Sequence, residues 1–553
     1  MTRLTRSDAS FEHVASTPIA VPTGEPGPLV TAPAGPVRGV WRRIVSAPDR
    51  RGDAPRFERS AAFYGIPYAE APSGERRFLA PVPRAPWTAE RPALTPSATP
   101  QRGSIFDDPA IPEPSVPGDD FLTLNVFTPA PGRTGARLPV LVWIHGGGWS
   151  SGSHNSPWYD GAAFNRDGVV TVSIAYRLGF DGYGWVDGSD APFNRAVLDQ
   201  VLALEWVRDN IAFFGGDPGE VTIGGQSAGG GNVMVLMTCP RARGLFRRAI
   251  SDSGAVTDFP ADAARSTARE MARLAGVEPN LEGWRALDYD RVFALTAELE
   301  KRRAERSPRV PLARRIRAAL VSAPDAGIVY GPAVDGRIVP LPVVEALARG
   351  EGGDVPLLAM STTHEFIRTA FELVEELGGR TAVEVMEEAG LGAGPAADYV
   401  AAHPELGGGE RLYLGALISD AMFHIPLLGW ARARERAGSA GTWLSRFAWE
   451  SPATGLSTHC LDLPFAFDCL AHPYCDHTLR AVPPQSLADA VHGDWTRFIL
   501  TGDPGWRPWD SRGDSRGSGR IYGDPRGARP DGAVDGGAFA VEQRLLEAGQ
   551  RLA

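Results

Sequence analysis

Residues 221–238 read VTIGGQSAGGGNVMVLMT and place one serine, Ser227, between closely spaced glycines. A short β-branched run precedes the serine, and an apolar run with helical character follows it. A G-x-S-x-G sequence between a strand and a helix forms a sharp turn from which the serine hydroxyl projects, and small neighbours leave it room. The stretch therefore predicts a strand, a tight turn and a helix, with Ser227 as a candidate nucleophile.

Strands and helices are expected to alternate around this turn. Residues 198–216 have apolar side chains near helical spacing and end in two glycines, which predicts a helix. Short apolar runs of the kind found in buried strands occupy 138–148, 168–177, 246–254 and 355–366. This alternation predicts an α/β fold in which a large, mostly parallel central sheet is flanked by helices.

A second glycine motif, His145-Gly-Gly-Gly-Trp149, directly follows the strand expected at 138–148. Consecutive glycines let backbone N–H groups approach a substrate oxygen without interfering side chains. Donors placed where negative charge develops accelerate acyl transfer by roughly 10²–10³ each. The order of the two motifs, each at the end of a strand, favours a serine nucleophile with an oxyanion site over two unrelated glycine turns.

Composition and charge exclude several classes of protein. The chain has 553 residues and a formal net charge of -10, and its arginines are scattered among acids with no basic stripe, so we expect no nucleic-acid partner. No uninterrupted apolar run approaches about 18 residues, so we expect no membrane span. The first residues lack a run of signal-peptide length, and only four cysteines occur, so we expect a cytoplasmic protein.

The chain divides into a short tail and one large domain. Residues 1–27 are polar and are expected to form a disordered tail, whereas 28–553 are expected to form a single domain. Within that domain, residues 258–320 and 370–440 have helical character and are expected to be insertions that cover the active site and line a substrate gorge. Residues 510–520 are of low complexity and are expected to form a loop.

Four potential metal ligands are crowded near the C-terminal part of the chain. Their spacing matches no standard zinc pattern, so ordinary packing is favoured and no metal is expected. These ligands are Cys469, His472, Cys475 and His477.

Further ordered motifs identify a family. The chain resembles the type-B carboxylesterases, the α/β-hydrolase group that includes bacterial para-nitrobenzyl esterases and cholinesterases, over about residues 28 to 525. The matching text includes FYGIPYA at 63–69, DDFLTLNV at 119–126, YRLG at 176–179 and FGGDP at 214–218. The resemblance implies an α/β-hydrolase fold and ester hydrolysis with no metal or organic cofactor.

The resemblance also implies a catalytic triad in the order serine, acid, histidine. Glu365 stands where the family has its acid, in VPLLAMSTTHEF at 355–366, and His459 stands where the family has its histidine, in LSTHCLDLPFAF at 456–467. With Ser227 they complete the triad. His364 is beside Glu365, but adjacent residues on a strand point to opposite sides, so it is not expected to be the base.

Other site residues follow from the same resemblance. The backbone N–H groups of Gly147, Gly148 and Ala228 are expected to form the oxyanion hole, and Ser253 is expected to hydrogen-bond near Glu365. Gln226 occupies the position of a glutamate in the family motif GESAG. Because an amide removes the negative charge next to the histidine, we expect a neutral or acidic small-molecule ester as substrate.

The chain departs from the family pattern at several other positions. Phe121 replaces the cysteine of the family's first disulfide, which agrees with a reducing compartment. Cys460 replaces the glycine after the catalytic histidine and adds bulk near the site. Phe193 and Ala196 also replace family glycines and are expected to reshape a pocket wall.

Several aromatic residues are candidate walls of the substrate pocket, although aromatic residues at such positions are as often part of the core. They are Trp149, Trp158, Phe180, Tyr183, Trp185 and Phe423. His145 is expected to be structural beneath the glycine loop, and His424 to be a packed histidine of the core or pocket.

Alternative functions remain open from the sequence. The same acyl-enzyme chemistry serves carbamates, lactones, amides and acyl transfer in a biosynthetic pathway. The family also includes catalytically inactive binding proteins, which typically lack a triad member, whereas all three are present here. The sequence does not decide between a monomer and a homodimer.

Overall fold

The structure of the chain is a computed structural model. It describes residues 20–552 apart from 46–54, 101–108, 255–257, 307–309, 322–328, 369–376, 408, 480–482, 512–518, 524–532 and 536.

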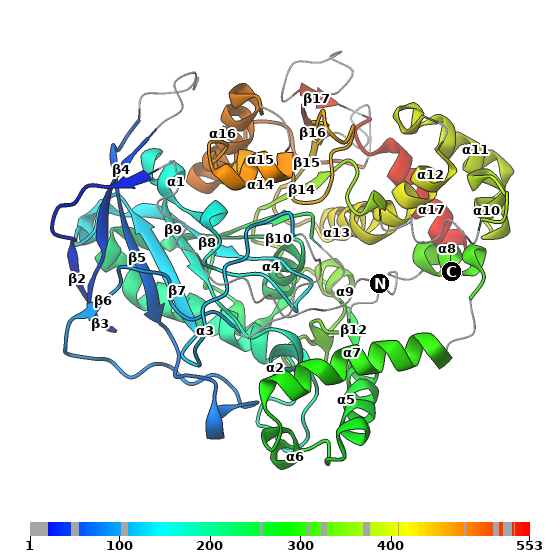
Figure 1. Cartoon of the computed structure of the whole chain (residues 1–553). Helices are drawn as coiled ribbons and strands as arrows, with labels where there is room; N and C mark the ends of the chain where they lie inside the picture. The colour runs from blue at the N-terminus through cyan, green and yellow to red at the C-terminus, as the bar shows by residue number, and fades with distance from the viewer. Residues whose placement is uncertain are drawn as a thin grey trace.

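A twelve-stranded mixed sheet runs through the molecule (Figure 1). Its central strands, from β9 to β16, pair in parallel, and antiparallel strands extend both edges. In spatial order the strands are β1 (Ala20–Pro22), β4 (Val40–Ile44), β5 (Arg59–Pro67), β7 (Thr123–Thr128), β9 (Val170–Ile174), β8 (Leu138–Ile144), β10 (Gly216–Gln226), β11 (Arg248–Asp252), β14 (Leu357–Thr362), β15 (Thr442–Phe447), β16 (Gly519–Tyr522) and β17 (Ala533–Asp535). The predicted α/β-hydrolase architecture is confirmed, with a sheet that is parallel at its centre.

Alternating side chains of β8 explain why the sheet is covered on both faces. Val140, Val142 and Ile144 belong to one hydrophobic core, whereas Leu141 and Trp143 belong to another. The first core includes side chains of α4 (Ala228–Thr238) and α3 (Arg195–Asn210), and the second includes side chains of α16 (Gln485–Thr501). Successive side chains of a strand point to opposite faces, so a fully apolar strand needs a helix layer on each side.

The parallel register places the ends of neighbouring strands at one edge of the sheet. Gln226 of β10 is level with Asp252 of β11, which is level with Met360 of β14. Loops that leave the carboxyl ends of parallel strands meet at that edge, which is where α/β proteins build their sites. The loops after β8, β10, β11, β14 and β15 therefore converge.

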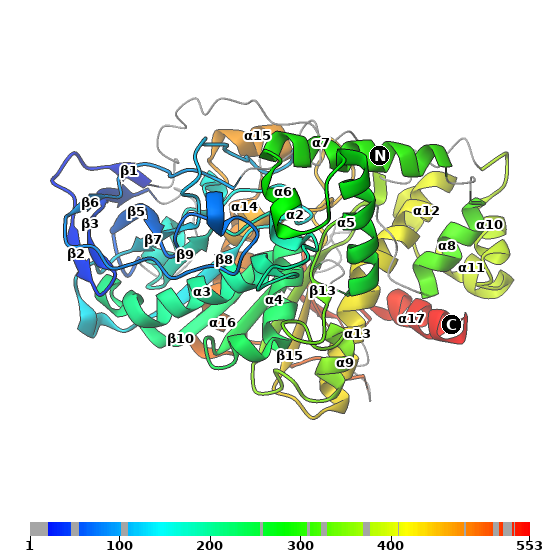
Figure 2. The ribbon, with the colours of Figure 1, turned by 90° about the horizontal axis from the view of Figure 1, so that it is seen from below.

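The two stretches expected to be helical insertions are helical in the described residues. The first contains α5 (Ala261–Ala275), α6 (Leu281–Arg285), α7 (Tyr289–Arg306) and α8 (Leu312–Val321), and the second contains α10 (Ala382–Glu388), α11 (Ala393–Ala401), α12 (Glu410–Ser419) and α13 (Ile425–Arg436). Helices α5, α6 and α7 lie together beside α2 (Gly179–Tyr183), whereas α8 packs with α10, α11, α12 and α17 (Ala540–Leu552), as Figures 1 and 2 show.

The remaining strands and α-helices are short. They are β2 (Leu29–Ala32), β3 (Gly35–Arg38) and β6 (Arg91–Pro92) in a small sheet, β12 (Phe259–Pro260) with β13 (Ala333–Val334), and the short helices α1 (Ala162–Arg166), α9 (Val343–Ala348), α14 (Leu463–Ala466) and α15 (Pro473–Leu479).

Two segments differ from the sequence-based expectation. Residues 20–22 form β1, which pairs with β4, so the sheet begins inside the segment expected to be a disordered tail; residues 1–19 lie outside the described residues. Gly519 and Arg520 begin β16, although 510–520 was expected to be a loop. Both strands are short, and each is held in the sheet by pairing with a longer neighbour. No local sequence pattern reveals this pairing.

One helical segment among the described residues, Glu410–Arg436, is long and apolar enough to cross a membrane by length and composition. Its most apolar window is 72% buried inside the fold. Core helices of globular proteins meet the same criteria, and this segment packs as one of them.

A buried ion pair fixes the start of α3 against the loop after β9. The Arg177 guanidinium donates to the Asp199 carboxylate at 2.7 and 2.8 Å, and both side chains are at most 1% exposed. Removing one member of such a pair leaves an uncompensated charge in the interior.

Asp199→Ala is therefore expected to lower the free energy of unfolding by about 3–5 kcal/mol, measured by urea denaturation. The exposed pair Arg208–Asp209 provides the control, because both side chains are more than half exposed. Asp209→Ala should change stability by less than about 1 kcal/mol. Equal effects of the two substitutions would contradict the role assigned to the buried pair.

Candidate active site

Ser227 lies in a strained turn between β10 and α4. Its φ of 58° and ψ of -125° are unusual for a residue with a side chain. Its backbone N–H donates to the Asp252 carbonyl at 2.9 Å, and its own carbonyl accepts from Gly231 of α4 at 2.9 Å. A side chain at Gly229 would come within 2.0 Å of the Ile144 carbonyl, so the serine turn requires glycine there. The predicted strand–turn–helix is present.

The glycine loop after β8 lies directly against this turn. A Cβ at Gly146 would stand 2.7 Å from the Gln226 carbonyl and 3.0 Å from the Ser227 Cβ. Gly147 and Gly148 have positive φ values of 112° and 55°. Below the loop, the His145 ring stacks on Tyr176 with centroids 4.6 Å apart, which agrees with the structural role expected for His145.

Three N–H groups around this turn are available to an oxyanion. Among the described residues, the backbone N–H groups of Gly147 and Gly148 donate to no other backbone group. Ala228 is the first residue of α4, and the first N–H groups of a helix have no acceptor within the helix. The three residues predicted for the oxyanion hole therefore offer unoccupied donors beside Ser227.

Glu365 and His459 are held together in the interior. The Glu365 carboxylate binds Nδ1 of His459 through one oxygen. Its other oxygen accepts from the Ser253 hydroxyl at 2.7 Å and from the Thr362 N–H at 2.9 Å. Burial opposes ionisation of this carboxyl, but His459 and these hydrogen bonds outweigh burial and lower its pKa. Glu365 is therefore a charged, oriented partner for the imidazole, and Ser253 binds it as expected.

Gln226 occupies the other side of the catalytic histidine. Its side-chain nitrogen lies 3.1 Å from Nε2 of His459 and 3.1 Å from the Cys460 sulfur. In the described residues, the Ser227 hydroxyl makes no hydrogen bond to His459. The amide N–H can donate to Nε2 only when the imidazole is neutral and carries its proton on Nδ1, toward Glu365. The amide must therefore give way to the Ser227 hydroxyl for proton transfer.

The surroundings of His459 favour its charged form. Burial disfavours the imidazolium, but the Cys460 sulfur and Glu365 outweigh burial and hold the pKa of His459 well above its usual range. The ring packs against both Phe366 and Phe423, with centroid distances of 4.6 and 5.0 Å. These two rings limit how far the imidazole can turn.

Among the described residues, His364 hydrogen-bonds to Ser457 and not to Ser227 or His459, although it lies in the turn after β14 and not on the strand, as strand alternation had assumed. Its Nδ1 accepts from the Ser457 N–H at 2.9 Å, and its backbone N–H donates to the Ser457 carbonyl at 2.8 Å. Burial lowers its pKa to about 4, which keeps the ring neutral and able to accept this bond. His364 therefore ties the loop that carries the acid to the loop that carries the base.

Two carboxyl groups that the sequence analysis did not single out lie beneath the triad. Asp252 and Asp462 are fully buried, and their side chains contact each other. Burial and the neighbouring negative charges raise the pKa of Asp252 well above its usual range, and burial and Glu365 raise the pKa of Asp462 to about 6. Two buried carboxyls in contact cannot both ionise, so they hold a proton between them.

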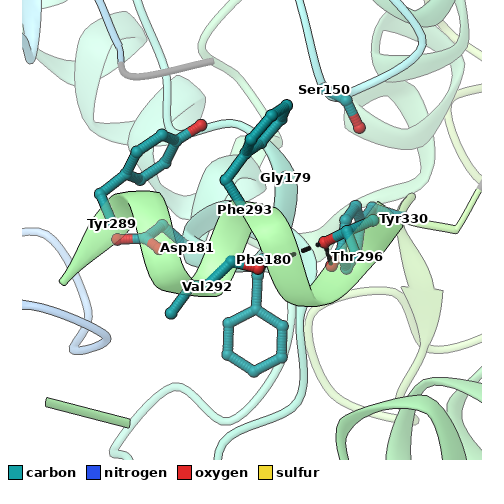
Figure 3. Close-up of a pocket in the computed structure, with 9 residues that line it drawn as sticks. All are labelled: Ser150, Gly179, Phe180, Asp181, Tyr289, Val292, Phe293, Thr296 and Tyr330. Atoms are coloured by element: carbon teal, nitrogen blue, oxygen red, sulfur yellow. Dashed lines mark hydrogen bonds between the residues drawn. The ribbon is translucent and has the colours of Figure 1, made fainter. Parts of the chain in front are cut away.

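A pocket borders the glycine loop (Figure 3). Four of its lining side chains are aromatic. The one charged lining residue, Asp181, pairs with Arg77 at 2.8 Å. The lining residues are Ser150, Gly179, Phe180, Asp181, Tyr289, Val292, Phe293, Thr296 and Tyr330.

The candidate wall residues divide between the pocket and the core. Phe180 lines the pocket and Phe423 packs on His459, whereas Trp158 belongs to the core on the other face of the sheet. Trp149 packs on Phe259 and donates to Asn232, below the glycine loop.

The cysteines near the C-terminal part pack as core residues. Cys469 and Cys475 are buried and unpaired, and the Cys475 thiol donates to the Cys469 carbonyl at 3.4 Å. The His472 ring accepts from the Tyr474 N–H at 3.2 Å. The side chain of His477 lies outside the described residues.

The sequence and the fold also match known proteins. Residues 27–517 match the profile described as the carboxylesterase family. The chain belongs to the carboxylesterase family. It is 31% identical over 464 residues to the para-nitrobenzyl esterase of Bacillus subtilis, covering 80% of this chain and 86% of that one. It is 33% identical over 468 residues to the phenmedipham hydrolase of Pseudarthrobacter oxydans, covering the same shares.

Solved structures agree with this family. A carboxylesterase of Geobacillus stearothermophilus superposes with a TM-score of 0.72 at 28% identity, covering 94% of this chain and 99% of that one. A para-nitrobenzyl esterase superposes with the same TM-score at 26% identity and the same coverage. The present chain is thus a carboxylesterase, an ester hydrolase of the α/β-hydrolase fold, as the resemblance implied.

Gln226 gives a direct test of the electrostatics at the base. Gln226→Glu adds a negative charge 3.1 Å from Nε2 of His459, which stabilises the imidazolium. Since the base must be neutral to act, the acid limb of the kcat/KM profile should move to higher pH by about one unit. Gln226→Met, which removes the hydrogen bond without adding charge, is the control and should not move the limb upward. An unchanged limb in Gln226→Glu would contradict the position assigned to Gln226.

Proposed function

We propose that this carboxylesterase hydrolyses a neutral or acidic small-molecule ester through an acyl-enzyme on Ser227. The observation that carries the proposal is the Glu365–His459 pair beside a strained serine turn, with N–H groups on the adjacent loop that donate to no backbone acceptor among the described residues. These are the parts that acyl transfer by a serine nucleophile requires.

The steps follow from the positions of these groups. His459 takes the Ser227 proton on Nε2 as the oxygen attacks the ester carbonyl, and Glu365 stabilises the imidazolium that forms. The N–H groups of Gly147, Gly148 and Ala228 stabilise the tetrahedral oxyanion. His459 then protonates the leaving alcohol, and water repeats the sequence to release the acid and restore Ser227.

In the described part of the chain, the site offers no unpaired carboxylate beside the base or in the pocket that would favour a cationic substrate. Gln226 contributes no charge beside the base, and the Asp181 carboxylate in the pocket is neutralised by Arg77. Phe180, Phe293 and the other aromatic residues of the pocket offer an apolar surface (Figure 3). We therefore assign this pocket to an apolar or aromatic group of the ester.

Carbamates are the second candidate substrates. The relative from Pseudarthrobacter oxydans is named a phenmedipham hydrolase and is 33% identical to this chain. A carbamate is attacked by the same serine and leaves a carbamoyl-enzyme. Comparing kcat/KM for aryl carbamates and aryl esters of the same leaving group distinguishes the two.

A cytoplasmic location is part of the same proposal. It is supported by four cysteines that are all unpaired, as in a reducing compartment. Fractionation of cells that produce the full chain tests it.

The nucleophile is tested with p-nitrophenyl esters from acetate to octanoate. We expect Ser227→Ala to retain its fold and to lose at least about 10⁴-fold in kcat. A wild-type protein that is folded but inactive on every ester, or a Ser227→Ala variant with undiminished turnover, would overturn the proposal.

The pocket assignment makes a separate prediction about α7. Phe293→Ala enlarges the pocket, so kcat/KM for octanoate relative to acetate should change by on the order of 10-fold. Arg302→Ala is the matched control, because Arg302 is on the same helix, is 44% exposed and pairs with Glu298. If both variants keep the wild-type chain-length preference, the pocket does not receive the acyl group.

A further inference from the structure

A π-helical turn, Asp420–His424, joins α12 to α13 and ends next to the catalytic residues. Turns of this kind are rare and occur often at functional sites. Two consecutive side chains of the turn, Phe423 and His424, are buried and reach toward the triad. Phe423 packs on the His459 ring with a centroid distance of 5.0 Å, so the turn touches the catalytic base.

His424 lies between two acceptors. Its Nδ1 is 2.6 Å from the Asp420 carboxylate, and its Nε2 is 2.8 Å from the Thr362 carbonyl. A neutral imidazole carries one N–H, whereas only the imidazolium can donate from both nitrogens. Carboxylate and carbonyl oxygens cannot donate, so the geometry requires a charged His424.

The groups around His424 support this charge. Burial disfavours it, but the bond to Asp420 and the charge of Glu542 outweigh burial and raise the pKa of His424, although Arg446 of β15 opposes it. The Tyr399 hydroxyl of α11 donates to the second Asp420 oxygen at 2.6 Å. The charge of His424 also contributes to lowering the pKa values of His364 and Glu365, which both follow β14.

His424 is connected to the catalytic acid through one residue. Thr362, the last residue of β14, gives its carbonyl to His424 and its N–H to Glu365 at 2.9 Å. The positive charge of His424 also contributes to lowering the pKa of Glu365. The backbone of Thr362 is thus fixed on one side by a cation and holds the acid on the other.

We propose that His424 is a positioning residue for ester hydrolysis, an imidazolium that fixes Thr362 and keeps Glu365 oriented and ionised behind His459. The proposal rests on the proposed function, because it assigns the acid role to Glu365. It extends the catalytic apparatus from the triad to the ion pair Asp420–His424.

A bound metal is the competing explanation, because ligand atoms of Asp420, His424 and Glu542 lie within 4.8 Å of one another. Both nitrogens of His424 already face hydrogen-bond acceptors, which leaves no lone pair for a metal. The Arg446 guanidinium also pairs with Glu542 at 2.5 Å. The cluster therefore holds a proton and not a metal ion.

The pH dependence follows from the raised pKa. A free histidine has a pKa of about 6.5, and the folded value is higher, so the stabilising charge is fully present below about pH 6.5 and is lost as the pH rises through the folded pKa. Above that pKa, Thr362 loses a donor and Glu365 loses a neighbouring cation. The kcat of the wild type should therefore fall on the alkaline side.

The experiment measures kcat and KM for a p-nitrophenyl ester against pH in three variants. His424→Gln keeps a donor but removes the charge, so kcat should fall on the order of 10-fold with KM within about twofold, and the alkaline fall should disappear. Asp420→Asn removes the partner that raises the His424 pKa, so the alkaline fall should move to lower pH. If His424 had a purely structural role, the alkaline fall of kcat would persist in His424→Gln and would stay at the same pH in Asp420→Asn.

His492→Gln is the matched control. His492 of α16 is also buried between two acceptors, Asp167 and the Ala466 carbonyl. Neither of these partners is a triad residue. This substitution should lower stability and leave the alkaline limb of kcat in place. An alkaline limb that moves equally in His492→Gln would overturn the proposal.

A readout independent of turnover separates this proposal from the proposed function. NMR of ¹⁵N-histidine-labelled Ser227→Ala protein, compared with the same protein carrying His424→Gln, should assign two N–H protons to His424 at pH 7. A single N–H, or one metal ion per chain that a chelator removes with loss of activity in the wild type, would overturn the proposal. An inactive wild type would refute the esterase function while leaving the charge of His424 measurable.

Discussion

The close approach of α4 to the end of β8 is the constraint on which the site depends. Gly229 allows the first turn of α4 to pass so near the Ile144 carbonyl that any side chain would collide with it. This contact forces Ser227 into its strained conformation and brings the glycine loop against the serine. Strain of this kind persists only when the surrounding structure fixes it, and here the buried parallel sheet does so.

A second theme is the number of charges held in the interior. Glu365 and the Asp420–His424 pair are buried and His459 is partly buried, and each charge has a partner or a hydrogen bond that offsets the loss of water. In this environment small displacements change pKa values strongly, which makes the site sensitive to substitutions that do not touch the substrate. The site therefore extends beyond the three residues of the triad.

The strand and turn around Ser227 were predictable because they depend on local chemistry. Glycine spacing and β-branched runs are visible in the sequence, and the order of motifs placed Glu365 and His459 near Ser227 by resemblance. Other features depend on contacts between distant segments. The pairing of β1 with β4, the contact of Asp252 with Asp462 and the position of His424 behind Thr362 arise only when the sheet brings separate loops together.

The histidines illustrate the same limit. The motif assigned His459 and not His364 as the partner of Glu365, and in the structure His459 binds Glu365 whereas His364 binds Ser457. The strand alternation used to set His364 aside does not apply, because His364 and Glu365 lie in the turn after β14. His424 was expected to be a packed histidine, and it is buried; its acceptor Asp420 lies four residues earlier in the same turn, but its second acceptor, the Thr362 carbonyl of β14, could not be inferred from its neighbours in sequence. Its charge is a property of the assembled fold.

The most direct test of the account is to trap the nucleophile. The wild-type protein is treated with a fluorophosphonate, digested and analysed by mass spectrometry. The account predicts a single adduct on the peptide that contains Ser227, with activity lost in proportion to labelling and no adduct in Ser227→Ala. An adduct on Cys460 or another residue, or full loss of activity without modification of Ser227, would contradict it.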